Sequence, residues 1–199
     1  MILRFLKIIL IVAVILVITI SIILLLLSMQ PFVPNNYTQI VKTGGELEAK
    51  YLAMGASQVE HMEVSTEEEW GNINVYYPKE LTESAKSYPV VVMVNGTGVY
   101  SSKYPALFKH LASWGFIVIG NEDPSTCSGS SADTTLAWLL NENENPDSRF
   151  YQKVRNTSEF PVTHRAAWAC STLSTNSRTV VCTLVRSAFL PHNWIWQKH

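Results

Sequence analysis

YPVVVMVNGTG, residues Tyr88 to Gly98, is the stretch that decides the fold. Tyr88 to Val94 is a continuous apolar run rich in β-branched side chains, and Asn95-Gly96 ends it. A strand that is buried on both faces has this pattern, whereas a half-buried strand alternates apolar and polar residues. We therefore expect a strand of a parallel sheet that helices cover on both sides.

The segments on either side extend this α/β pattern. Residues 71–77 (GNINVYY) alternate in the manner of a half-buried strand, and residues 116–120 (FIVIG) predict another buried one. Residues 104–114 (YPALFKHLASW) and 132–141 carry apolar side chains at helical spacing. Strands that alternate with helices predict an α/β fold with a parallel-sheet core and flanking helices, of which two or three strands precede residue 154.

The N-terminus predicts a membrane anchor. Residues 8–29 contain no charged side chain and would form a helix of about 33 Å, enough for a hydrocarbon core of about 30 Å. Arg4 and Lys7 precede the run, so the positive-inside rule predicts a cytoplasmic N-terminus and an extracytoplasmic remainder. A cleaved signal peptide is the alternative, but its apolar region would be shorter and would end at a small-residue cleavage site. We expect residues 8–29 to contact the lipid bilayer as a single-pass anchor.

The sequence divides into four segments. They are the anchor (1–29), a short linker with two prolines (30–36), a folded region (37–154) and a C-terminal tail (155–199). The formal net charge of −1 gives no basic face for nucleic acid, and we exclude that partner. The three cysteines, Cys127, Cys170 and Cys182, have no metal-ligand spacing, and their disulfide state stays open. We expect no metal site.

The turn after the central strand is the candidate for chemistry. Ligands bind α/β sheets outside the carboxyl ends of the strands, where Asn95 to Gly98 lies. Gly96 and Gly98 would let the backbone approach a reacting group and turn N–H groups toward an oxyanion. A tight turn without a ligand is the alternative. No G-K-[ST] or G-x-G-x-x-G follows, so neither a phosphate loop nor a dinucleotide site is indicated, and we expect no cofactor.

A longer stretch carries a family resemblance. YPVVVMVNGTGVYSSKYPALFKHLASWGFIVIGNEDPSTCSGSSADTTLAWLL resembles the first half of bacterial α/β-hydrolases of the cutinase, polyester hydrolase and dienelactone hydrolase branch, over about Asn72 to Val154. In that group a strand ends in H-G-x-G or a variant, a helix runs to LAS-x-GF-x-V, and a Ser-rich loop precedes an LDWL-type helix. The resemblance implies an incomplete α/β-hydrolase fold and, in the intact family, hydrolysis of a small carboxylic ester.

The resemblance also implies an oxyanion hole. The backbone N–H of Thr97, between Gly96 and Gly98, would be one of its donors. Asn95 stands where a histidine is common, which leaves the hole possible because the donor belongs to the main chain. Such enzymes need a G-x-S-x-G elbow soon afterwards, followed by an acid and a histidine.

The chain as written contains no nucleophile, acid or base of this kind. Ser128 lacks the flanking glycines of an elbow, and we interpret it as a loop serine. His110 falls within a predicted helix and is interpreted as a surface or packing residue, while His164 and His192 belong to the tail. We therefore expect the chain to be inactive as a hydrolase.

The tail does not resemble the rest of the domain. The last glycine is Gly129, although α/β turns and the elbow both need glycine. Up to Val154 there are 15 acidic and 10 basic residues, whereas from Arg155 onward there is one acidic residue against five basic ones. We expect residues 155–199 to be out of frame and poorly ordered.

The genetic code provides a test of this hypothesis. We joined the last base of each codon to the first two bases of the next. Residues 161–170 (PVTHRAAWAC) then permit Gly-His-Ser-Gln-Gly-Gly-Val-Gly-Val, in which one glycine is forced because Trp168 has a single codon. Residues 157–161 (TSEFP) permit Ile-Gly-Val-Ser, which resembles the strand before the elbow. We infer a frameshift that begins near Val154.

Two other interpretations compete with a truncated, membrane-anchored serine hydrolase. In the first, the chain is a non-enzymatic, membrane-tethered α/β protein with a binding or structural role, and the tail is a genuine segment. In the second, the chain is a small structural protein in which only the N-terminal helix matters. The first predicts that the tail packs on the sheet, and the second predicts that no ordered sheet forms.

Overall fold

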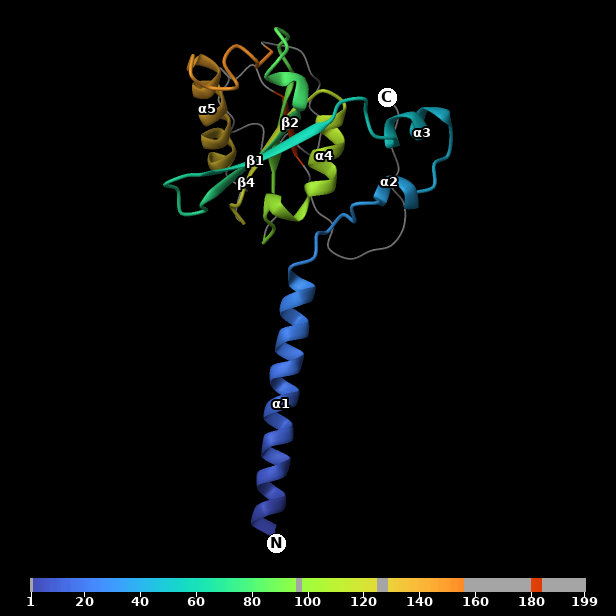
Figure 1. Cartoon of the computed structure of the whole chain (residues 1–199), viewed down its shortest axis with the longest axis vertical. Coiled ribbons are helices and arrows are strands. Elements are labelled where there is room, and N and C mark those ends of the chain that lie inside the picture. The colour runs from blue at the N-terminus through green and yellow to red at the C-terminus, as the bar shows by residue number, and fades with distance from the viewer. Residues whose placement is uncertain (1, 96–97, 125–128, 156–179, 184–199) are drawn as a thin grey trace. The chain divides into compact units, whose positions relative to one another are not determined.

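The computed structural model describes residues 2–95, 98–124, 129–155 and 180–183, and the chain divides into two compact units, Met1–Phe32 and Val33–His199. The first unit is built on one long helix, α1 (Ile2–Ser28) (Figure 1). Residues 4–28 are long and apolar enough to cross a membrane, and a signal sequence would meet the same criterion. The hydroxyls of Thr19 and Ser21 donate to carbonyl oxygens one turn earlier, so these polar side chains are satisfied within the helix.

The second unit is organised around a five-stranded sheet. Its strands are β1 (Val59–Ser65), β2 (Asn72–Pro78), β3 (Val90–Val94), β4 (Ile117–Asn121) and β5 (Val180–Thr183), in the spatial order β1-β2-β4-β3-β5. β3 lies between β4 and β5 and is parallel to both, while β2 is antiparallel to β1 and β4. The predicted α/β class with a parallel core is confirmed, and β2 adds an antiparallel member.

Helices α4 and α5 cover opposite faces of this sheet (Figure 1). The helical elements of the unit are α2 (Tyr37–Ile40), α3 (Glu46–Leu52), α4 (Pro105–Ser113), α5 (Ser130–Glu144) and the short 3-10 turns η1 (Lys79–Leu81) and η2 (Ser101–Lys103). Pro105 suits the first turn of α4, and Gly115, at φ +91°, provides the left-handed residue that ends it.

The burial of β3 explains its unbroken apolar sequence. Val90, Val92 and Val94 belong to the core beneath α5, where Leu136 and Leu139 are also buried. The alternate residues of β3 belong to the second core, beneath α4, together with Phe108, Ala112 and Val118. Because both faces are covered, neither set of side chains can be polar. This prediction from the sequence is confirmed.

The N-terminal half of the sheet differs from expectation. Four strands precede residue 155 rather than two or three, because β1 was not foreseen. β1 is an edge strand on which Met62 and Val64 are partly buried against the core, and its sequence, VEHMEVS, also carries Glu60, His61 and Glu63. These polar residues dilute the period-two signal on which the prediction depended. The sheet itself excludes the interpretation in which only the N-terminal helix matters.

The tail contributes one element to the described structure. Four of its residues form β5, opposite residues 91–94 of β3. Residues 156–179 and 184–199 lie outside the described residues, so the expectation of a poorly ordered tail stays a prediction there. The predicted segment limits at residues 29, 36 and 154 also stay predictions.

Gly120 of β4 offers a test of the packing between the sheet and α4. A Cβ atom at Gly120 would lie 2.8 Å from Phe108 Cζ and 2.9 Å from Ser101 Cβ. We expect Gly120→Ala to lower the free energy of unfolding by about 1–3 kcal/mol through overpacking, measured by urea denaturation. Gly45→Ala is the matched control, because a Cβ there meets nothing within 4 Å. Equal stability of the two variants would contradict the packing described here.

Candidate functional site

The carboxyl ends of β3 and β4 lie at the same edge of the sheet, because the two strands are parallel neighbours. Asn95 follows β3 directly, and residues 121–124 lead away from β4. This edge is where open α/β sheets bind their ligands. We define the loop from Asn95 to Tyr100 as the oxyanion loop, after the role that the sequence predicts for it.

Asn95 ties the start of this loop to the end of β4. Its side-chain Nδ2 donates to Asn121 O at 2.7 Å and to Asp123 O at 3.0 Å, and Asn121 Oδ1 lies 3.3 Å away. The Asn95 side chain is buried, and Asn121 Nδ2 in turn donates to Thr135 Oγ1 on α5 at 2.9 Å. Asn95 is therefore linked directly to the end of β4, and through Asn121 to α5.

Gly98 forms a second tie. Its backbone N–H donates to Pro124 O at 2.8 Å, and its φ of +75° is a conformation that glycine adopts without strain. Gly98 therefore shapes the loop, and its own N–H is already engaged. Gly96 and Thr97 lie outside the described residues, so the predicted donor, Thr97 N–H, stays a prediction.

Glu122 forms a third set of hydrogen bonds beside the oxyanion loop, and the sequence analysis did not predict this role. Its carboxylate accepts hydrogen bonds from Ser102 N at 2.8 Å, Ser102 Oγ at 2.7 Å, Ser101 Oγ at 2.6 Å and Asn74 Nδ2 at 2.7 Å. Hydrogen bonds to a charged group are stronger than neutral ones. The turn η2, which directly follows the oxyanion loop, is thus fixed to the residue after β4.

The serines of this cluster do not form a nucleophilic site. Ser101 is 1% exposed, and its hydroxyl donates directly to Glu122 with no base between them. His61 Nε2 contacts Asn74 Oδ1 at 3.0 Å instead. A catalytic serine needs an adjacent base, usually a histidine, and access to substrate. Ser101 is buried, and Ser102, although exposed, donates its hydroxyl to the Glu122 carboxylate rather than to a histidine.

His110 has a structural environment. Its Nε2–H donates to Tyr51 O at 2.9 Å, which leaves Nδ1 to accept a hydrogen bond from the Tyr37 hydroxyl. Burial lowers the pKa of His110, and the hydrogen bond to Tyr51 partly opposes that shift. Both ring nitrogens are therefore engaged, in keeping with a packing role. Ser128, His164 and His192 lie outside the described residues.

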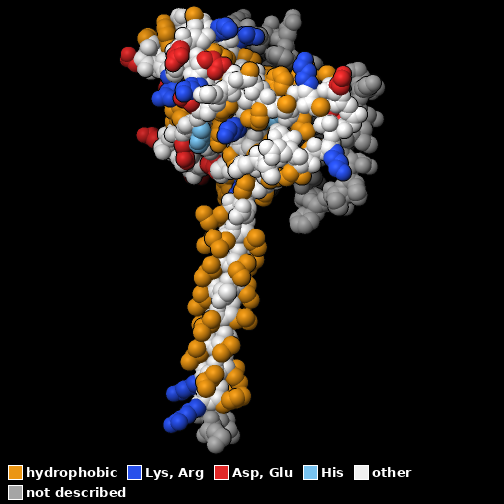
Figure 2. Space-filling view, turned by 45° about the vertical axis from the view of Figure 1, so that its right-hand side comes forward, with side chains coloured by type: hydrophobic (Ala, Val, Ile, Leu, Met, Phe, Trp, Pro, Cys, Tyr) orange, Lys and Arg blue, Asp and Glu red, His pale blue; other side chains and the backbone are white. Residues whose placement is uncertain are grey.

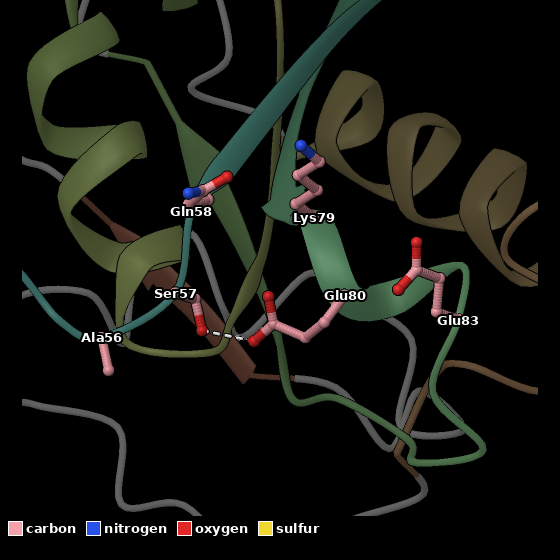
Figure 3. A pocket seen from close by; sticks show the side chains of 6 residues that line it. All are labelled: Ala56, Ser57, Gln58, Lys79, Glu80 and Glu83. Atoms are coloured by element: carbon pink, nitrogen blue, oxygen red, sulfur yellow. Dashed lines mark hydrogen bonds between the residues drawn. The ribbon is translucent and has the colours of Figure 1, made fainter.

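A shallow hollow lies at the other end of the strands, away from the carboxyl ends of β3 and β4 (Figure 3). It is lined by Ala56, Ser57, Gln58, Lys79, Glu80 and Glu83, where β1 begins and β2 ends. The Ser57 hydroxyl donates to Glu80, and no histidine or cysteine lines the hollow. Within the described part of the chain, no group of three or more His, Cys, Asp or Glu side chains could hold a metal ion.

Comparison with known proteins agrees with this architecture. A family model described as Chlorophyllase matches residues 48–135, which run from α3 through β4 into the first half of α5 and include the oxyanion loop. A search of the curated proteins found no significant match.

The sheet with its parallel centre, the covering helices and the loop at the carboxyl edge define an α/β-hydrolase type of domain. The matched family is α/β-hydrolase-like, and the match over residues 48–135 is consistent with the N-terminal half of an α/β-hydrolase superfamily member. The family match suggests an esterase-like function. The resemblance inferred from the sequence is therefore confirmed at the level of the superfamily.

Asn95→Asp tests the first tie of the oxyanion loop. The substitution keeps the shape of the side chain but places a carboxylate oxygen against acceptor oxygens of Asn121 and Asp123. We expect the free energy of unfolding to fall by about 2–4 kcal/mol, since a buried donor is lost and a charge is left unpaired. Asn36→Asp, on the exposed N-cap of α2, makes the same change of charge and should alter stability by less than about 0.5 kcal/mol. Equal losses of stability for the two variants in urea denaturation would contradict the role of the Asn95 hydrogen bonds.

Proposed function

We propose that this chain is the N-terminal part of a membrane-anchored serine hydrolase of carboxylic esters, with a reading frame that breaks near Val154, and that it is inactive as written. The observation that carries the proposal is the path of the chain after α5. Tyr88 N donates to Lys153 O at 2.6 Å, Arg155 N donates to Tyr88 O at 2.8 Å, and Tyr88 and Val154 form a parallel bridge. The chain thus enters the sheet beside β3 at Val154.

The register of this bridge indicates where the next strand belongs. Since Tyr88 lies opposite Val154, a strand continuing in the same register would set positions 157–160 opposite residues 91–94. In the structure, Val180–Thr183 lies opposite these residues instead. The strand that lies opposite residues 91–94 is therefore β5, which comes well after the bridge in the sequence.

The written sequence gives a physical reason. A parallel strand covered on both faces needs a nearly continuous apolar run. Asn156, Thr157, Ser158 and Glu159 are all polar, so burying them at this position would leave polar groups and a charge to be satisfied. At positions 157–160 the regrouped codons permit Ile-Gly-Val-Ser, which suits a buried strand.

The same register supports the position of the regrouped elbow. Gly-His-Ser-Gln-Gly would begin directly after the position opposite Val94, at the carboxyl edge and next to the oxyanion loop. In α/β-hydrolases the nucleophilic serine lies on the sharp turn between a strand and the following helix. A motif recovered from the codons and a register taken from the sheet thus agree on one location.

This location gives the restored enzyme a simple mechanism. The elbow serine would attack the ester carbonyl while a downstream histidine accepts its proton and an acid orients the histidine. The N–H of Thr97 and that of the residue after the serine would stabilise the oxyanion. The ties at Asn95, Gly98 and Glu122 hold the loop in place before substrate binds. The chain as written lacks the nucleophile and the base.

The anchoring is part of the same proposal. α1 is followed by a folded domain, and its only charged residues, Arg4 and Lys7, lie at its N-terminal end. By the positive-inside rule the N-terminus would be cytoplasmic and the domain extracytoplasmic. The substrate would then be a small ester that reaches the outer face of the membrane.

The test compares the written chain with a frame-restored chain on a p-nitrophenyl ester. We expect hydrolysis only from the restored chain. In that chain Thr97→Pro should lower kcat about 10²- to 10³-fold, because it removes one oxyanion donor. Thr97→Ala keeps the backbone N–H and should retain most of the activity. Activity of the written chain, or equal losses in the two Thr97 variants, would contradict the proposal.

One observation favours the alternative of a non-enzymatic, membrane-tethered α/β protein. Residues 180–183 of the tail pair with β3 along residues 91–94. If the tail is genuine, deleting residues 176–199 should destabilise the sheet, as urea denaturation would reveal. If the frame is broken, this deletion should leave the unfolding midpoint unchanged.

A further inference from the structure

Among the described residues of the second unit, the exposed large apolar side chains are concentrated in residues 40–54. Its exposed large aliphatic side chains are Ile40, Val41, Leu47 and Met54, at 45% exposure or more, and Tyr51 joins them at 56%. From residue 55 to residue 155, the described residues add only Tyr100 and Tyr151 to this set. The segment comes directly after α1, whose apolar side chains are visible along its length in Figure 2.

This segment is fixed to the domain by its backbone and by Tyr37. His110 binds the Tyr37 hydroxyl and the Tyr51 carbonyl, so one side chain of α4 holds both α2 and α3. Trp114 Nε1 donates to Ala53 O at 3.0 Å, at the end of α3. No residue of α2 or α3 is buried, so neither helix is held by a core of its own. The apolar side chains are thus displayed on an anchored surface.

The charges of the segment indicate what kind of surface it contacts. Lys42 and Lys50 are balanced by Glu46 and Glu48, so no net positive charge would draw it to anionic lipid. Lys50 Nζ lies 5.6 Å from the centre of the Tyr51 ring. A lysine with an apolar stem beside a tyrosine suits the boundary between water and hydrocarbon, where both side chains keep a polar end in water.

We propose that residues 33–54 form an interfacial platform, with Ile40, Val41, Leu47, Tyr51 and Met54 in contact with the headgroup and upper acyl region of the bilayer. The proposal rests on the anchoring role of α1 proposed above. Eight residues, 29–36, separate Ser28 from Tyr37, which allows a distance of at most about 30 Å between the two Cα atoms. The platform therefore stays within reach of the membrane surface, and apolar contact rather than charge provides its affinity.

Photolabelling of the full chain tests this platform. The protein is reconstituted in phosphatidylcholine vesicles that contain a phosphatidylcholine with a photoreactive group at the top of its acyl chain. Adducts are mapped by mass spectrometry. We expect adducts in residues 40–54 and in α1, and none in the polar connector of residues 79–87. Addition of salt or of anionic lipid should leave the labelling of residues 40–54 unchanged.

A double variant, Leu47→Gln with Met54→Gln, makes the test sharper. Labelling of residues 40–54 should fall about tenfold while that of α1 is unchanged, because burial of large apolar side chains is lost. Glu83→Gln with Lys86→Gln is the control and should change neither. Both variants alter exposed positions, and circular dichroism verifies that they fold.

The outcomes separate the platform from the anchor. Labelling of α1 without labelling of residues 40–54 would overturn the platform and leave the anchor intact. Absence of labelling in both would overturn the anchoring and the platform together. In a parallel experiment with a bifunctional amine cross-linker, cross-links from Lys42 or Lys50 to a second copy or to the tail, together with an absence of lipid adducts in residues 40–54, would assign the surface to that occupant and overturn the proposal.

Discussion

The rest of this structure depends on one constraint, which is that the edge of β3 away from β4 also needs a hydrogen-bonding partner. β3 is buried on both faces, so each of its backbone N–H and C=O groups needs a partner within the protein. β4 supplies partners along one edge. The other edge requires a further parallel strand, and a parallel strand between two helical layers has to be apolar. The chain reaches that edge at Val154 and then becomes polar.

Two segments of the chain thus lie along this same edge, one beside Tyr88 and one beside β3. Val154 forms an isolated parallel bridge to Tyr88 there, and residues 180–183 lie opposite the C-terminal part of β3. The proposed frameshift would account at once for the polar sequence after Val154, the absence of glycine beyond Gly129 and the elbow motif in the regrouped codons. A genuine tail would explain β5 but would leave the other three observations unrelated.

The candidate site is organised independently of the tail. Asn95, Gly98 and Glu122 connect the oxyanion loop to the residues after β4, and all of them precede Val154. An oxyanion hole is effective when its donors are fixed before the reaction begins. On the proposed function, the nucleophile, base and acid would all come after Val154, whereas the hydrogen bonds that support the oxyanion loop come before it.

The sequence predicted strands β2, β3 and β4 and helices α4 and α5, but it did not predict the edge strand β1. β3 and β4 were recognisable because burial on both faces makes every residue apolar, and α4 and α5 because their apolar residues recur at helical spacing. β1 was missed because polar residues interrupt its alternation. The role of Glu122 was also missed, because a glutamate after a strand resembles any loop residue until folding brings Asn74, Ser101 and Ser102 to it.

The most direct measurement is the nucleotide sequence of the gene across the codons for Tyr151 to Cys170. The account predicts that one missing base, once restored, gives the Gly-His-Ser-Gln-Gly elbow and an open frame beyond it. A confirmed present frame, with residues 180–183 shown to stabilise the sheet, would contradict it.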